Sequence, residues 1–71
     1  MEDELQIYVG SYNEEELKRQ GLFIMVWADS QCLFDMPHYR QHCYLINDDY
    51  GLKRFGGSAY VVEKEWFNKN N

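Results

Sequence analysis

The chain has 71 residues, a formal net charge of −5 and an aromatic content of 17%. A chain of this length forms one domain, which we place at residues 1–71, and its aromatic rings supply enough apolar area for a folded core. No apolar run approaches the roughly 20 residues that cross a bilayer. No basic and apolar leader opens the sequence, so we expect a cytoplasmic domain whose two cysteines are reduced.

The acidic residues are concentrated at one end of the chain. Residues 1–16 contain six acids and no base, whereas residues 17–71 contain six acids and seven bases. The two local charges are therefore −6 and +1, which sum to the net charge of −5. Because contacts to phosphate need clustered Lys and Arg, this distribution disfavours direct binding to nucleic acid.

The first predicted element is a strand at residues 5–9. Apolar and other residues alternate there, so that Leu5, Ile7 and Val9 would face a core. The glycine that follows, Gly10, would end the strand.

The second predicted element is a short helix at residues 13–21. Asn13 can cap its N-terminus, and Glu16 stands three residues later, where a capping-box acid would stand. Acids fill the first turn and bases the last, as the helix dipole favours, and Gly21 suits the position after the helix. Because so short a helix is unstable alone, we expect Leu17 to hold it on the surface of the domain.

The longest apolar run, Leu22–Trp27, is predicted to be the central strand. Six residues are too few for a free-standing helix, and the run is rich in β-branched and aromatic side chains. Both of its faces are apolar, so both must be covered, as in a strand at the centre of a sheet. We therefore expect Trp27 to be buried.

The second half of the chain reads as short strands joined by turns. The predicted segments are a turn at 29–31, a short strand or a loop at 32–34, a connection at 35–40, a strand at 41–46, a hairpin loop at 47–51, a return strand at 52–55, a bulge or bend at 56–57, a strand at 58–62, a closing segment at 63–67 and a frayed tail at 68–71. Cys43 and Leu45 would share one face of their strand. Trp66 and Phe67 would anchor the closing segment in the core.

These elements predict an α+β domain with a small, mostly antiparallel sheet of four to five strands and one short N-terminal helix. The strand–helix–strand opening favours this class. The all-strand second half also fits an SH3-like small β-barrel, in which Gly56 and Gly57 would form the corner. The barrel is the alternative architecture.

Metal binding and catalysis find little support in the residue pattern. Cys32, His38, His42 and Cys43 are residue types that bind zinc, but the closely spaced cysteine pair of a zinc knuckle is missing. The neighbours His42 and Cys43 would also point to opposite faces of a strand. No pattern places a cysteine nucleophile beside a histidine base, and so short a chain has little room for a shielded pocket. We expect no metal, no cofactor and no enzymatic activity.

The tyrosines point instead to protein binding. The chain has 6 Tyr, more than so small a core can hold, and Tyr is favoured at protein–protein interfaces. The alternative is that the rings cover a small core edge-on, with their hydroxyls in water. The predicted partner-binding residues combine the acids of the first sixteen positions with two tyrosines: Glu2, Asp3, Glu4, Tyr8, Tyr12, Glu14, Glu15 and Glu16.

The segment Ile7-Tyr8-Val9-Gly10, followed by Tyr12-Asn13-Glu14, resembles the opening of ArdA-type antirestriction proteins. Members of that family are acidic DNA mimics that occupy the DNA groove of restriction enzymes. The resemblance covers fewer than ten residues, and the rest of this much shorter chain does not follow the family. It implies a mechanism in which the carboxylates of residues 2–4 and 14–16 stand where phosphates would stand.

These patterns predict a non-enzymatic protein-binding domain whose acidic, Tyr-rich surface binds a protein partner with a basic surface. A specific form is a small phage-type inhibitor, antirestriction or anti-CRISPR-like, that mimics nucleic acid and blocks a nucleic-acid-binding protein. The alternative is a structural or adaptor module with an SH3-like barrel that self-associates through exposed aromatic rings and a free sheet edge.

Overall fold

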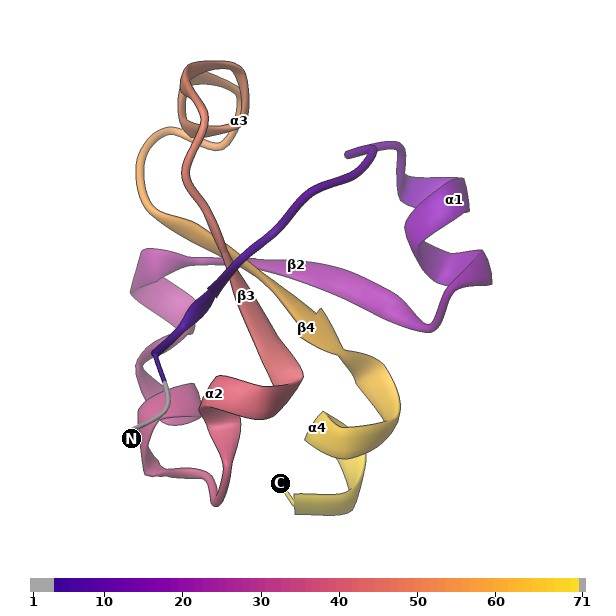
Figure 1. Cartoon of the computed structure of the whole chain (residues 1–71), viewed down its shortest axis with the longest axis vertical. Helices are drawn as coiled ribbons and strands as arrows, with labels where there is room; N and C mark the ends of the chain where they lie inside the picture. Colours follow the sequence, from indigo (N-terminus) through magenta and orange to yellow (C-terminus); the bar gives the residue numbers. More distant parts are fainter. Residues whose placement is uncertain (1–3, 71) are drawn as a thin grey trace.

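The computed structural model describes residues 4–70, which form a four-stranded mixed sheet with helices around it (Figure 1). The strands are β1 (Gln6–Ile7), β2 (Leu22–Val26), β3 (Cys43–Ile46) and β4 (Ala59–Glu63), in the order β1-β3-β4-β2. β1 runs parallel to β3, and the other two pairings are antiparallel. The α+β class is therefore confirmed, and the barrel alternative is wrong because the sheet stays open at β1 and at β2.

The structure contains several helices where the sequence predicted one. They are α1 (Glu14–Arg19), the 3-10 helices η1 (Trp27–Asp29) and η2 (Gln31–Asp35), α2 (Tyr39–His42), α3 (Asp49–Arg54) and α4 (Lys64–Asn70). Each spans at most two turns, which is too short for an apolar period to be read from the sequence. α4 also includes residues 68–70, which were expected in a frayed tail. Within residues 4–70, no helix is long and apolar enough to cross a membrane.

The predicted helix α1 is confirmed, together with its cap. The Asn13 side chain accepts a hydrogen bond from the Glu16 backbone N–H at 3.0 Å. Leu17 is buried and attaches the helix to the sheet. Gly21 follows the helix with a φ of 76°, a left-handed conformation that glycine adopts without strain.

The centre of the sheet is β4, and the prediction that Leu22–Trp27 would occupy it is wrong. β4 pairs with β3 on one side and with β2 on the other, and its residues 59–62 are all buried. β2 pairs only with β4, and its five residues are half-buried. Trp27 lies beyond the strand, in η1, and is 49% exposed. Apolar residues on both faces of β2 indicate that side chains pack above and below the strand. They do not indicate whether another strand is hydrogen-bonded to each of its two edges.

Two hydrophobic clusters fill the two faces of the sheet. The first, which we call cluster A, contains the buried residues Leu33, Met36, Cys43, Tyr60, Val62 and Trp66. The second, cluster B, contains the buried residues Tyr12, Leu17, Ile46, Ala59 and Val61. Alternate residues of β4 enter alternate clusters, as the pleat of a strand requires. The predicted faces of β3 are confirmed, because Cys43 belongs to cluster A and Leu45 packs against it, whereas Ile46 belongs to cluster B.

The predicted hairpin at residues 47–55 is wrong, because this segment forms α3. Asp48 caps the helix by accepting a hydrogen bond from the Gly51 N–H at 2.5 Å. Gly51 is needed here for space: a Cβ at this position would lie 2.5 Å from Ile46 Cγ2 and 2.8 Å from Tyr12 Oη. Gly56, with a φ of 75°, follows the helix rather than bending a strand. The run Asn-Asp-Asp-Tyr-Gly fits a turn and a capped helix equally well.

The first strand is shorter than predicted. Ile7 and Val9 were expected to face a core, but their side chains are 48% and 90% exposed. Only the flanking Leu5 and Tyr8 pack against the clusters. The pairing with β3 ends near Tyr8, whose N–H donates to the Leu45 carbonyl at 2.8 Å. The alternation of apolar residues in the sequence therefore continues beyond the end of the strand.

The segment at residues 32–34 is neither a strand nor an open loop. It lies in η2, where Leu33 is fully buried and Phe34 is half-buried. Leu33 is therefore the residue of this segment that enters the core, and Phe34 packs against it from the side of cluster A.

The two tryptophans give a direct test of the revised sheet order. Trp66 is buried, and we expect Trp66→Ala to lower the free energy of unfolding by about 3–5 kcal/mol. Trp27 is half-exposed, so Trp27→Ala should lower the free energy of unfolding by less than about 2 kcal/mol. Urea denaturation of both variants measures the difference. Equal losses would show that Trp27 belongs to the core after all.

Gly51→Ala should destabilise the domain by about 1–3 kcal/mol, because the added methyl group overpacks the contact with Ile46 and Tyr12. Lys53→Ala is the matched control, since Lys53 is exposed on the same helix. Urea denaturation should show a loss for the first variant only. A Gly51→Ala protein as stable as the control would contradict the close approach.

Candidate functional site

The predicted acidic site is centred on the first turn of α1. Glu14 and Glu15 are exposed there, and Glu4 is exposed as well. Glu16 is half-buried, forms an ion pair with Arg19 and accepts a hydrogen bond from Gln20 at 3.2 Å. Glu2 and Asp3 lie outside the described residues. Within residues 4–70, no ion pair occupies Glu14 or Glu15, so these two carboxylates face solvent uncompensated.

The two predicted tyrosines lie side by side but differ in exposure. The rings of Tyr8 and Tyr12 have centroids 5.8 Å apart. Tyr8 is half-buried, and its hydroxyl donates to the Ser11 carbonyl at 2.9 Å. Tyr12 is buried and also packs against Tyr50 and Phe55, at centroid distances of 6.0 and 5.8 Å. Tyr12 thus supports the surface from beneath, whereas Tyr50, 63% exposed, is a ring on the surface that the sequence did not assign to the site.

Tyr12 connects the start of α1 to the start of α3. Its hydroxyl donates a hydrogen bond of 2.7 Å to Asp48 Oδ2. Burial, and then this bond, raises the pKa of Tyr12 to about 12. The bonds from Tyr12 and from the Gly51 N–H lower the pKa of Asp48. Asp48 therefore stays ionised and adds a negative charge beside α1, which no local pattern in the sequence indicated.

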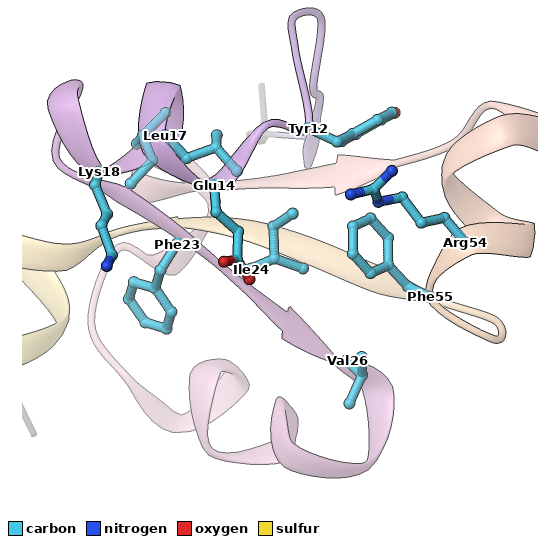
Figure 2. Close-up of a pocket in the computed structure, with 10 residues that line it drawn as sticks. Tyr12, Glu14, Leu17, Lys18, Phe23, Ile24, Val26, Arg54 and Phe55 are labelled. Atoms are coloured by element: carbon cyan, nitrogen blue, oxygen red, sulfur yellow. The ribbon is translucent and has the colours of Figure 1, made fainter.

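A groove of about 460 Å³ lies over β2, between α1 and the end of α3 (Figure 2). Its apolar lining includes Ile24 and Val26 of β2 and Phe55 just after α3. Figure 2 shows Glu14 reaching over it from α1 and Arg54 reaching over it from α3. In the described part of the chain, no ion pair joins these two side chains.

A second polar cluster joins α2, β3, β4 and α4. His42 Nδ1 lies 2.8 Å from Glu63 Oε1, and the Tyr44 hydroxyl donates to Glu63 Oε2 at 3.1 Å. The His42 ring stacks on Trp66 with centroids 5.1 Å apart, and Trp66 Nε1 donates to the Pro37 carbonyl at 3.3 Å. Each group has a partner in another element, so this cluster ties α4 to the sheet. No local pattern in the sequence indicates this cluster, because its members are up to 29 residues apart.

The zinc-type residues are not brought together. No group of three or more His, Cys, Asp or Glu in residues 4–70 could hold a metal ion. Cys43 is buried in cluster A and Cys32 is exposed in η2. Burial raises the pKa of the Cys43 thiol to about 11, so it is a poor nucleophile.

The chain was compared with models of protein families, with curated proteins and with solved structures. None of them matches. The resemblance of residues 7–14 to the opening of antirestriction proteins therefore stays an expectation from that short segment, and the function is argued from the site itself.

Changing Tyr12 to Phe tests the connection between α1 and α3. It should lower the free energy of unfolding by about 1 kcal/mol near neutral pH, because one hydrogen bond is lost. Tyr50→Phe is the control, since the Tyr50 hydroxyl is at the surface and, among residues 4–70, its one hydrogen bond is accepted from Arg54 Nη1 at 3.0 Å. Its effect should be negligible.

The pH dependence of the Tyr12→Phe effect follows from the two pKa shifts. The pKa of Tyr12 is raised on folding, so its contribution is complete below pH 10 and is lost as the pH rises from 10 to about 12. The pKa of Asp48 is lowered, so the contribution of the pair also falls as the pH drops through the ordinary carboxyl value of about 3.9. Urea denaturation from pH 3 to 12 measures the contribution as the difference in the free energy of unfolding between the unchanged protein and Tyr12→Phe. A constant difference would contradict the bond.

Proposed function

We propose that the protein is a non-enzymatic binding domain that docks its acidic α1 surface on a protein partner with a basic surface. The observation that carries the proposal is the pair of exposed, uncompensated carboxylates of Glu14 and Glu15. Charged groups held at a surface without an internal partner attract oppositely charged proteins and orient them on approach. Ionised Asp48 strengthens the field at this end of the molecule.

The tyrosines supply the apolar part of the proposed contact. Tyr8 and Tyr50 each present part of a ring at this end of the molecule, and Tyr12 holds both of them from below. Rings fixed in this way lose little conformational entropy on binding, which is one reason why Tyr is frequent in interfaces.

The specific form of the proposal is a small phage-type inhibitor that mimics nucleic acid. Its carboxylates would occupy phosphate positions in an antirestriction or anti-CRISPR-like interaction and so block a nucleic-acid-binding protein. The acidity of residues 1–16, with a charge of −6, supports this form, as does the short capped helix that presents Glu14 and Glu15. A self-associating module is the second candidate, favoured by the open edge of β2.

A competition experiment tests the inhibitor. The protein should displace a fluorescent DNA duplex from a type I restriction enzyme, or from a Cas9–guide complex, and the displacement should weaken as salt is added. The double variant Glu14→Gln/Glu15→Gln should bind roughly tenfold more weakly, since two exposed charge contacts are lost. Glu16 is left unchanged because it already pairs with Arg19.

The matched control is Asp35→Asn/Glu65→Gln, which changes the net charge by the same amount with two exposed acids of η2 and α4. It should displace DNA as the unchanged protein does. Equal losses of DNA displacement in the two double variants would show that net charge alone, and not the position of Glu14 and Glu15, causes the effect. An absence of displacement from both enzymes would contradict the inhibitor form.

A further inference from the structure

The free edge of β2 exposes a regular set of backbone groups. Lys64 N–H donates to the Gly21 carbonyl and Trp27 N–H donates to the Ser58 carbonyl, each at 2.8 Å, at the two ends of the β2–β4 ladder. In an antiparallel ladder only every second residue bonds to its partner strand. The backbone N–H and C=O groups of the odd-numbered residues of β2 therefore bond to β4. Those of Leu22, Ile24 and Val26 point away from it.

Nothing in β2 protects this edge. Its sequence, Leu-Phe-Ile-Met-Val, contains no charge and no proline, and every residue pairs in register with β4 without a bulge. The groove over β2 is lined by Phe23 as well as Ile24, although neighbouring residues of a strand point to opposite faces. The groove therefore extends around the free side of the strand, where another strand can reach its backbone.

We propose that a second copy of this chain docks at this edge, an inference that rests on the self-associating module named above as the second candidate function. Two β2 strands would run antiparallel about a two-fold axis through Ile24, so that Ile24 lies opposite Ile24 of the second copy and Leu22 lies opposite Val26 of the second copy. In this register every outward N–H of one β2 meets an outward carbonyl of the other. The two sheets become one continuous sheet, and the self-complementary pairing closes after two copies.

The charges on the groove favour a second copy over an unrelated strand. α1 lies at the Leu22 end of β2, and the end of α3 lies at the Val26 end (Figure 2). The two-fold axis brings α1 of each copy toward the α3 end of the other. Glu14 on α1 then faces Arg54 of the second copy, while no ion pair joins Glu14 to Arg54 within one chain. Each interface contains this acid–base contact twice.

Amide hydrogen exchange on the unchanged protein, with no partner added, tests the register. When the concentration is raised from micromolar to millimolar, exchange at Leu22, Ile24 and Val26 should slow about tenfold. Phe23 and Met25 should be protected at both concentrations, because they bond within one chain. A strict monomer in sedimentation equilibrium at millimolar concentration would overturn the proposal, as would concentration-dependent protection without this alternation, which would point to another surface.

Lysine substitutions on the two free edges of the sheet show which of the edges mediates self-association. Ile24→Lys should abolish self-association, whereas Ile7→Lys on β1 should leave it unchanged, since Ile7 is already 48% exposed on the opposite edge. Circular dichroism checks that both variants are folded. The reverse result would assign the contact to β1 and overturn the proposal. If Ile24→Lys does not fold, the exchange experiment on the unchanged protein decides.

Mixing two charge variants tests the contact between copies. Glu14→Arg and Arg54→Glu should each weaken dimer formation roughly tenfold, because each substitution turns two attractive contacts into repulsive ones. A one-to-one mixture of the two variants should restore association, since both contacts are again between opposite charges. No recovery on mixing would overturn the assigned pairing. The readout is self-association alone, so it is independent of the proposed binding to a basic partner.

Discussion

β4 is hydrogen-bonded along both of its sides and buried on both of its faces, and the other elements are placed by it. Its alternating side chains create cluster A on one face of the sheet and cluster B on the other. Leu17 attaches α1 to cluster B, while Leu33 and Trp66 attach η2 and α4 to cluster A. In the described sheet two strands, β3 and β4, are paired on both sides, which leaves β1 and β2 as edges.

Tyr12 has the corresponding role at the acidic end of the molecule. It is a member of cluster B, it packs against three other aromatic rings, and it donates a hydrogen bond to the residue that caps α3. The positions of Glu14 and Asp48 relative to each other thus depend on one buried side chain. A charged surface of this kind is preorganised, because the cost of arranging it is met during folding.

Local signals in the sequence were reliable where a single residue determines local geometry. Asn13 predicted the start of α1, and the alternation of Cys43 and Leu45 predicted the faces of β3. Signals that depend on neighbours failed: the apolar run at Leu22 could not show which strand lies beside it. Asp48 fits a turn as well as a cap in the sequence; in the structure it caps α3 by accepting from the Gly51 N–H, and it also accepts from Tyr12, which lies 36 residues away. The acidic surface was predictable from composition, whereas the contribution of Asp48 and the burial of Tyr12 depend on tertiary contacts.

The close packing around Gly51 also bears on how the chain can change in evolution. A Cβ at this position would lie 2.5 Å from Ile46 Cγ2 and 2.8 Å from Tyr12 Oη, so any side chain here requires one of these neighbours to shift. A larger residue at position 51 should therefore be tolerated best when position 46 or position 12 carries a smaller one. The effects of substitutions at positions 12, 46 and 51 should therefore be non-additive, because the three side-chain positions share one tightly packed space.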